Sequence, residues 1–252
     1  MKLMFGVFAV ERGINLIGLL PGSSRSAENV ILIVGAHLDT VCESPGTVDN
    51  GSGLAALLES AWILSSQNVE NTILFVAFDF EEIGLFGSNN FVNVWLAEYL
   101  QNFSGHLVGA IILDTIMNYN GSKFAQYIPT NLGQEFPKFR SSVATRSNRG
   151  DFVLLLGRAQ DAWLSSTFSR SFNSISPKSN LQPWLEQVEL GSHQSNLVDT
   201  YFRGRMKSCY HYHCDDSSFL TEENLEYLSV ITAALVQTLN TSSVSEFVAL
   251  KN

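Results

Sequence analysis

The sequence predicts a three-layer α/β/α sandwich built on a central mixed, largely parallel sheet. Three nearly continuous apolar runs, residues 30–36 (VILIVGA), 72–78 (TILFVAF) and 107–113 (LVGAIIL), are typical of strands that are buried on both faces. Helix-like stretches over residues 53–66 and 88–101 separate these runs. This alternation of strand, loop and helix favours parallel strands with helices covering the sheet.

The pattern weakens in the second half of the chain. Residues 151–157 (DFVLLLG) are a further strand candidate, and residues 222–239 have the pattern of a final helix. Glu222 and Glu223 open this helix, where the helix dipole favours acidic side chains. Because no internal linker divides the chain, residues 1–252 are expected to form one domain with a substantial core.

The first part of the chain contains two short apolar runs. Residues 1–10 (MKLMFGVFAV) resemble the core of a signal peptide, but a polar turn and a second apolar run at residues 14–22 follow at once. Two short runs around a turn favour a β-hairpin over a signal peptide. No apolar run reaches the roughly 18 residues that cross a bilayer, so no membrane span is expected in this chain.

Composition narrows the class of protein. Hydrophobic residues make up 45% of the chain and charged residues 15%, as in globular proteins. The formal net charge of −9 argues against nucleic acid or an anionic membrane as a partner. Divalent cations bound in an acidic site would offset part of this charge.

Cysteines and glycosylation sequons favour a secreted or luminal location. Cys209 and Cys214 are close enough in sequence for a local disulfide in an oxidising compartment, whereas Cys42 stands alone. Sequons begin at Asn102, Asn120 and Asn240.

Histidine and carboxylate side chains follow the ends of the three predicted strands. His37 and Asp39 follow the first run, Glu81 and Glu82 the second, and Asp114 ends the third. The carboxyl ends of parallel strands meet at one edge of the sheet, and this edge is where α/β proteins bind ligands. We therefore expect these side chains to converge.

Each element taken alone has an ordinary explanation, such as a turn histidine or a capping Asp49 before a glycine-rich turn. Together they indicate a metal site, because the adjacent Glu81 and Glu82 repel one another unless a cation is near. One of the two can bind metal while the other takes a proton from water. Asp49 has two oxygens and can bridge two metals. Nitrogen and oxygen ligands without cysteine suit a hydrolytic zinc site.

A late histidine is the remaining ligand candidate. His211 lies in a loop shortly before the final helix, and His213 is its rival because it is only two residues away. His106 and His193 lack a comparable context and are interpreted as ordinary core or surface histidines.

Five motifs in this order resemble the co-catalytic zinc aminopeptidases. They are GAHLDT, TVDNGSG, FEEIGLFGS, LDT, and YH with Asp four residues on, and the resemblance covers residues from about 14 to 240. That family includes glutamate carboxypeptidases, glutaminyl cyclases and the catalytically silent transferrin receptors. The resemblance implies a peptidase that binds two Zn²⁺ ions and hydrolyses N-terminal peptide bonds.

The resemblance also implies a role for each site residue. His37 and Asp114 bind one zinc, Glu82 and His211 bind the other, Asp49 bridges the two, Glu81 is the general base, and Asp39 orients His37. It further implies a cis peptide between Asp49 and Asn50, a disulfide between Cys209 and Cys214, and His211 rather than His213 as the ligand.

Two departures from the family pattern stand out. Relatives usually have a helix upstream of the first hairpin, so the amino terminus is expected to be truncated. Residues 179–200 are hard to match, and we expect a core strand to be shortened or lost there.

Three alternatives remain open. A glutamate-type carboxypeptidase would have the same zinc ligands, a glutaminyl cyclase uses one zinc, and a receptor-like domain would lack catalytic strength. Against the cyclase, the chain keeps Asp49 and a complete pair of Glu81 and Glu82. Against the receptor-like domain, no ligand of the family pattern is lost.

Overall fold

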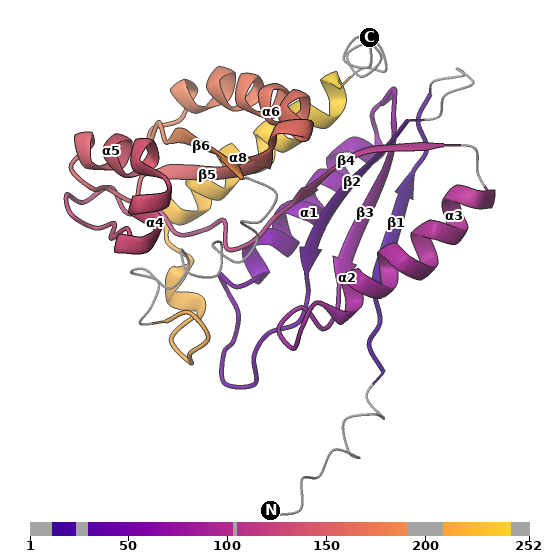
Figure 1. The fold of residues 1–252 in the computed structure, drawn as a ribbon, viewed down its shortest axis with the longest axis horizontal. Helices are drawn as coiled ribbons and strands as arrows, with labels where there is room; N and C mark the ends of the chain where they lie inside the picture. Colours follow the sequence, from indigo (N-terminus) through magenta and orange to yellow (C-terminus); the bar gives the residue numbers. More distant parts are fainter. Residues whose placement is uncertain (1–11, 24–29, 103–104, 191–208, 243–252) are drawn as a thin grey trace, which may run out of the picture.

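The computed structural model describes residues 12–23, 30–102, 105–190 and 209–242 (Figure 1).

A four-stranded sheet forms the centre of the fold (Figure 1). Its strands are β1 (Leu16–Leu20), β2 (Val30–His37), β3 (Thr72–Phe78) and β4 (His106–Ile112), in the spatial order β1-β3-β2-β4. β2 runs parallel to β3 and to β4, whereas β1 is antiparallel to β3. The predicted α/β class with a mixed, mostly parallel sheet is therefore confirmed.

The two inner strands are buried on both faces. Along β2, Leu32 and Val34 point into a cluster shared with helices α1 (Gly51–Ser65) and α8 (Glu222–Thr241), while Ile33 points into a cluster on the opposite face. Alternate residues of an extended chain face opposite sides, so a strand covered on both sides must be apolar at every position. This explains the unbroken apolar runs in the sequence.

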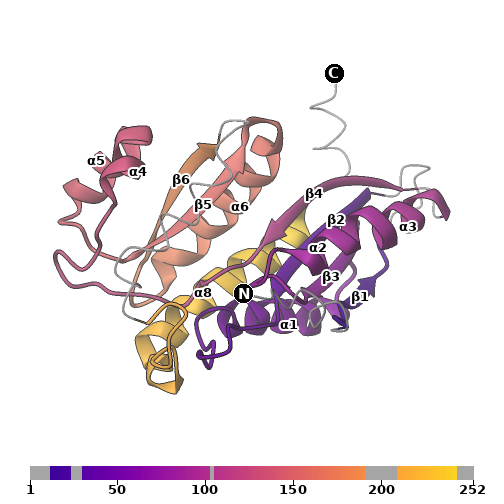
Figure 2. The same cartoon turned by 60° about the horizontal axis from the view of Figure 1, so that its bottom comes forward.

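A helical segment covers the face of the sheet opposite α1 and α8 (Figures 1 and 2). It consists of α2 (Phe86–Asn90), the π-helical η2 (Phe91–Leu96) and α3 (Ala97–Asn102). The segment begins two residues before the predicted helix, after Leu85 in the left-handed conformation. Ser88 lies inside the helix and donates its hydroxyl to the carbonyl of Leu85.

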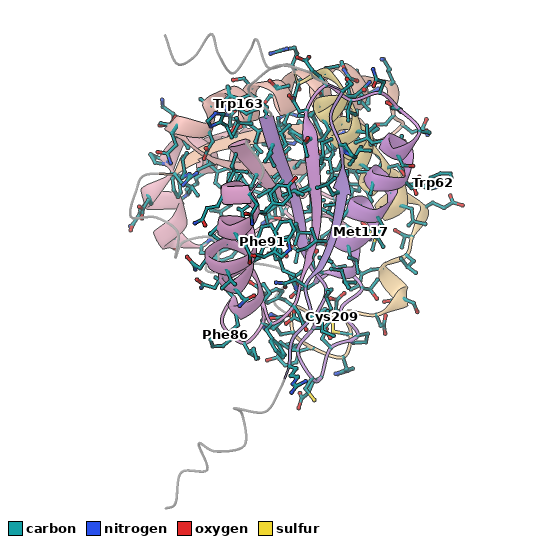
Figure 3. The ribbon with its side chains drawn as sticks, turned by 90° about the vertical axis from the view of Figure 1, so that its right-hand side faces the viewer. Trp62, Phe86, Phe91, Met117, Trp163 and Cys209 are labelled. Atoms are coloured by element: carbon teal, nitrogen blue, oxygen red, sulfur yellow. A yellow bond between two sulfur atoms is a disulfide. The ribbon has the colours of Figure 1, made fainter. Side chains whose placement is uncertain are left out.

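Aromatic rings hold this helical segment on the sheet. Phe91 packs edge-on against Phe78 of β3, with ring centroids 5.4 Å apart. Trp95 stacks on Phe91 and Tyr99 stacks on Trp95, because residues four apart lie on one face of a helix. Figure 3 shows Phe91 between the helix and the strands, whereas Trp62 projects outward from α1.

A second, two-stranded parallel sheet is formed by β5 (Phe152–Arg158) and β6 (Trp184–Leu190). β5 confirms the predicted strand at residues 151–157. The sequence did not indicate β6, the helices of this region or its short 3-10 turns. The helices are α4 (Thr130–Glu135), α5 (Pro137–Thr145) and α6 (Ala162–Ile175). The 3-10 turns are η3 (Ala159–Asp161), η4 (Ser176–Lys178) and η6 (Ser217–Phe219).

Helix α6 joins the cores of the two sheets. Its side chains Leu164, Phe168 and Phe172 share one apolar cluster with Val108 of β4 and Val153 of β5. A separate cluster of Phe139, Val143, Phe152 and Val188 packs α5 against β5 and β6. The described strands thus form two sheets, and a single three-layer sandwich stays a prediction.

Some sequence predictions fall outside the described residues. They concern the first half of the amino-terminal hairpin, residues 191–200 of the segment that is hard to match, and His193. The second apolar run of the predicted hairpin forms β1, and β6 at 184–190 shows that a strand is present within 179–200. Among the described residues, no helix is both long enough and apolar enough to cross a bilayer. A single domain over residues 1–252 stays a prediction.

Leu235 of α8 tests the shared core. It is fully buried, so Leu235→Ala should lower the free energy of unfolding by about 2–5 kcal/mol through lost burial and the cavity left behind. Leu225→Ala in the same helix is the control, because Leu225 is 45% exposed and its truncation should cost no more than about 0.5 kcal/mol. Urea denaturation measures both, and equal losses would contradict the packing described here.

Candidate metal centre

The site lies where the carboxyl ends of β2, β3 and β4 meet, at the lower edge of the sheet in Figure 1. His37 is the last residue of β2 and is aligned with Phe78, the last residue of β3. Backbone hydrogen bonds from Leu38 to Phe78 and from Leu113 to Gly35 keep the strand ends level, at 2.8 Å each. The segments that follow the three strands therefore start at the same edge, as predicted.

Asp49 lies between two imidazoles. Its Oδ1 is 3.1 Å from Nε2 of His37, and its Oδ2 is 3.3 Å from Nε2 of His211. Asp114 approaches the same nitrogen of His37 at 3.7 Å, and Glu82 approaches that of His211 at 3.0 Å. The result is two groups of potential ligands that share Asp49, and within each group the ligand atoms lie within 4.8 Å of one another.

The glycine-rich turn after Asp49 is held by Asn50. The peptide bond between these two residues is cis, as the resemblance implied. The Asn50 side chain accepts from Gly53 N at 2.9 Å, capping α1, and donates to Leu113 O at 2.8 Å. A Cβ at Gly53 would lie 2.7 Å from that carbonyl, so the close approach requires glycine. Asn50 thereby connects the segment carrying Asp49 to the one that leads to Asp114.

Asp39 forms hydrogen bonds both with the ring of His37 and with the backbone of Glu81 and Glu82. Its main-chain carbonyl lies 3.0 Å from Nδ1 of His37, whereas its carboxylate is 3.7 Å from that nitrogen. An Nδ1–H donated to this carbonyl leaves Nε2 free to bind a metal. The carboxylate accepts the backbone N–H groups of Glu81 and Glu82 at 3.1 Å each. The ring is thus held mainly by the backbone of Asp39, while its side chain holds the two glutamates.

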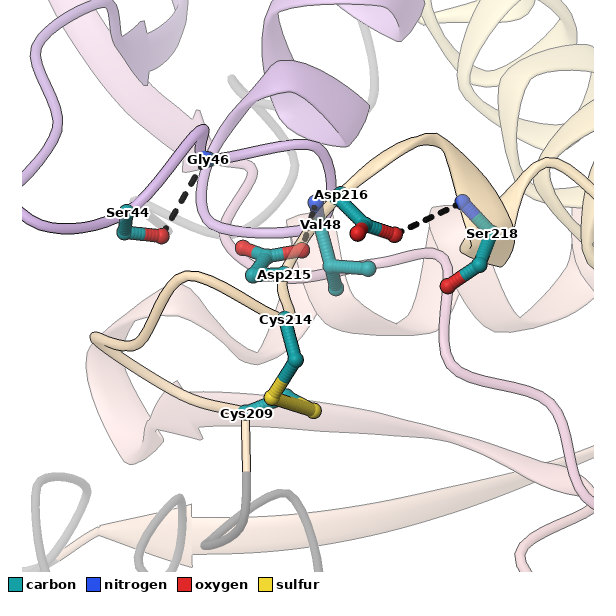
Figure 4. The surroundings of a disulfide bond; sticks show 8 residues. All are labelled: Ser44, Gly46, Val48, Cys209, Cys214, Asp215, Asp216 and Ser218. Carbon is teal, nitrogen blue, oxygen red and sulfur yellow. Dashed lines mark hydrogen bonds between the residues drawn. A yellow bond between two sulfur atoms is a disulfide. The ribbon is translucent and has the colours of Figure 1, made fainter.

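The loop that carries His211 is closed by a disulfide between Cys209 and Cys214 (Figure 4). The ring of His211 stacks on Tyr210 with centroids 3.8 Å apart and points at Asp49. His213 is exposed and belongs to none of the ligand groups found among the described residues. The structure therefore brings His211 rather than His213 to the site.

Burial and the crowding of carboxylates shift the pKa values of several site residues. Burial raises the pKa of Glu82 to about 7, and the charge of Asp49 adds to the effect. Burial also raises the pKa of Glu81, against the partial compensation of His37. Burial disfavours the imidazolium of His37, but the nearby carboxylates of Asp114 and Asp49 outweigh it and raise the pKa of His37 to about 11.

The residues present fit a divalent metal. Several buried polar atoms of the described residues lack any hydrogen-bond partner, which is costly unless a cation binds them. Those in the site are Asp49 Oδ2, Glu82 Oε1, Asp114 Oδ1 and His211 Nε2. Imidazole nitrogens with carboxylate oxygens are the ligand set that favours zinc over calcium or magnesium. Glu81 forms a third such group with His37 and Glu82.

The sequence did not indicate a role for two buried polar residues beside the site, Asn50 and Asp215, which are 1% and 2% exposed. Both lie inside the motifs, Asn50 directly after Asp49 and Asp215 four residues after His211. Their importance depends on which backbone groups the loops present to them, and composition does not reveal this.

Imidazole and carboxylate groups gather at the carboxyl edge of an open α/β sheet. This arrangement places the protein among α/β proteins with a candidate metal centre at the sheet edge. The chain belongs to peptidase family M28, whose sequence profile matches residues 15–153.

Similar proteins span a longer chain than this one. An aminopeptidase from Pseudomonas aeruginosa (strain UCBPP-PA14) is 26% identical over 96% of this chain, which corresponds to 45% of that protein. A probable lipoprotein aminopeptidase, LpqL, from Mycobacterium tuberculosis is 52% identical over 68 residues, 27% of this chain and 13% of that protein. The structure of a zinc aminopeptidase from Bacillus subtilis superposes with a TM-score of 0.53 at 20% identity, covering 92% of this chain and 52% of that one. This last likeness shows a shared fold.

At about pH 6, zinc binding is expected to displace a proton from Glu82 that is already lost at about pH 9. Metal ligands bind deprotonated, so His37, whose pKa is about 11, loses a proton at either pH. Glu82, whose pKa is about 7, holds a proton only at the lower pH and should add about one more per chain. Calorimetry in buffers of different ionisation enthalpy counts the protons. Glu82→Gln should release about one proton fewer than the unaltered protein at about pH 6 and the same number at about pH 9. Equal release by the two proteins at about pH 6 would contradict the prediction.

Proposed function

We propose that this chain is a zinc-dependent aminopeptidase that releases the N-terminal residue of peptides. The observation that carries the proposal is the position of Asp49, whose two oxygens each face a different imidazole. Such an arrangement suits two zinc ions that share one carboxylate. The names of the Pseudomonas relative and of the Bacillus structure support the aminopeptidase activity.

The proposed ligands divide between two metal positions. His37 and Asp114 would hold one zinc, Glu82 and His211 the other, and Asp49 would bind both. Zinc at these positions would polarise the scissile carbonyl and lower the pKa of a water molecule. The Asp39 carbonyl accepts the Nδ1–H of His37 and so orients the ring with Nε2 available for zinc.

Glu81 is the proposed general base. Its backbone N–H is held by Asp39, and its carboxylate lies in one group with His37 and Glu82. Glu81 accepts a proton from the attacking water as the new C–O bond forms, and returns it to the amine nitrogen as the C–N bond breaks. Burial raises the pKa of Glu81, and a raised pKa suits a carboxylate that must hold this proton between the two steps.

An extracytoplasmic location is part of the proposal. The disulfide between Cys209 and Cys214 persists in oxidising compartments and is rare in a reducing cytosol. The name of the mycobacterial relative, a probable lipoprotein, points the same way.

Glu81→Gln tests the proposed base. The amide cannot accept the proton, so kcat/KM for an aminoacyl-anilide should fall by about 10²–10⁴-fold. Zinc content by elemental analysis should stay that of the unaltered protein, because Glu81 is not a proposed ligand. Glu59→Gln on the exposed side of α1 is the control and should keep full activity. A fully active Glu81→Gln protein would overturn the mechanism.

The two ends of the substrate distinguish the proposed activity from its alternatives. Peptides with a free amino group and an amidated carboxyl end should be cleaved, and N-acetylation should abolish cleavage. Mass spectrometry of the products identifies the released residue. A requirement for a free carboxyl end would show a carboxypeptidase instead, and loss of ammonia from an N-terminal glutamine would show a cyclase.

A further inference from the structure

Asp215 holds the backbone of the segment that carries Asp49. One carboxylate oxygen accepts the N–H of Val48 at 2.8 Å, and the other accepts the N–H of Asp49 at 3.0 Å. The main-chain carbonyl of Asp215 accepts the N–H of Thr47 at 3.2 Å. Figure 4 shows the Asp215 carboxylate directed at Val48. Three consecutive backbone amides therefore depend on one residue that is 2% exposed.

The same residue belongs to the loop that carries His211. The disulfide from Cys209 to Cys214 closes this loop, and Asp215 is the next residue. Backbone hydrogen bonds from Tyr212 to Cys209 and from Asp215 to Tyr212 fold it tightly, at 2.9 and 3.0 Å. Asp215 thus connects the loop of His211 to the segment of Asp49, two residues whose facing atoms are 3.3 Å apart.

The chemistry of Asp215 explains why a carboxylate is needed. A buried carboxylate must have its oxygens satisfied, and here each oxygen receives one backbone N–H. Within the described part of the chain, Asp215 forms no ion pair with a lysine or arginine, so its charge serves these amides. An asparagine could accept one N–H and would turn its own NH₂ toward the other.

Asp39 provides a parallel within the same site. Its carboxylate accepts the consecutive amides of Glu81 and Glu82, as that of Asp215 accepts those of Val48 and Asp49. In both cases a carboxylate that binds no metal in the proposed scheme holds the backbone of a proposed ligand, Glu82 in one case and Asp49 in the other. A hydrogen bond to the backbone amide of a ligand residue fixes the position of its Cα, and therefore the position from which its side chain reaches the metal. A hydrogen bond in a turn far from the site has no such effect on the ligands.

We propose that Asp215 is a positioning residue for the group of Asp49, Glu82 and His211. It sets the separation of Asp49 and His211 and thereby the affinity of this group for zinc. The inference rests on the proposed function for the identity of the metal, and it concerns binding rather than turnover. Residues that hydrogen-bond to metal ligands without binding the metal contribute about 10–100-fold to metal affinity.

Asp215→Asn in the full chain tests the inference, and Asp216→Asn is the matched control. Asp216 is the neighbouring residue, but its carboxylate accepts the N–H of Ser218 and does not contact the site (Figure 4). Competition against a chromophoric zinc chelator should show one zinc bound about 10–100-fold more weakly in Asp215→Asn. The control should bind both zinc ions as the unaltered protein does. Cobalt-substituted protein should show a changed visible spectrum in Asp215→Asn alone.

Thermal unfolding separates positioning from a merely structural contact. A purely structural role would lower the melting temperature equally with and without zinc. A positioning role should also shrink the rise in melting temperature that zinc produces, because this rise reports the metal affinity of the folded state. Should Asp215→Asn fail to fold, Asp215→Glu keeps both acceptor oxygens but moves them by one methylene. It should bind one zinc at least severalfold more weakly.

The outcomes distinguish the inference from the proposed function. Zinc affinity within about twofold of the unaltered protein in a folded Asp215 variant would overturn the positioning role and leave the peptidase proposal intact. Weakened zinc binding by the Asp215 variant would support the positioning role even if the unaltered, zinc-loaded protein cleaved no peptide. That second result would overturn the peptidase proposal alone. An unaltered protein that binds no zinc would overturn both.

Discussion

The burial of Asp49 between two imidazoles is the constraint on which the rest of the site depends. Asp49 is 4% exposed, and one of its oxygens has no hydrogen-bond partner. Transferring an unpaired carboxylate from water into a protein costs several kcal/mol, so the fold must place compensating positive charge beside it. His37, whose pKa is raised to about 11, supplies such charge beside one oxygen of Asp49, and divalent ions would complete the compensation. The same cations would also serve the remaining acidic groups.

The sheet makes this concentration of charge possible because it cannot slip. A shift of one residue between β2 and β3 would exchange the side chains that face the two apolar clusters, and both strands are buried on both faces. The ends of β2, β3 and β4 therefore stay level, and the three segments that follow them stay in contact. The backbone of these segments is then held by hydrogen bonds that Asp39 and Asp215 accept and that Asn50 donates. Rigid strands define the edge, and buried polar side chains define the loops.

The predictability of each part follows from where its information lies. The inner strands and the last helix were predicted because continuous apolar runs and an acidic first turn are local features. Helix α6 was missed because its many serines are weak helix formers and mask the four-residue spacing of Leu164, Phe168 and Phe172. The hydroxyls of Ser169 and Thr167 donate to carbonyls four residues earlier, so these polar groups are satisfied within the helix, which the composition does not reveal. β6 (WLEQVEL) was missed because its charged residues leave it half-exposed.

The candidate site was more predictable than the fold around it. His37, Glu82 and Asp114 occur next to strand ends, so their sequence positions imply convergence. The backbone contacts of Asp39 and Asp215 could not be inferred in this way, since they depend on how two separate loops present their amides. A ligand is recognised by its chemistry, but a residue that positions a ligand is recognised only by what it touches.

The metal centre and the core are separate sources of order. The apolar clusters contain buried side chains from β2, β3, α1, α6 and α8, and none of the proposed ligands belongs to them. Small zinc domains fold only with metal because they lack such a core. Here the charged state of His37, whose pKa is raised to about 11, supplies positive charge to the carboxylates when metal is absent. Zinc would replace that proton within a framework that the core has already formed, so the site can be held in place before the metal arrives.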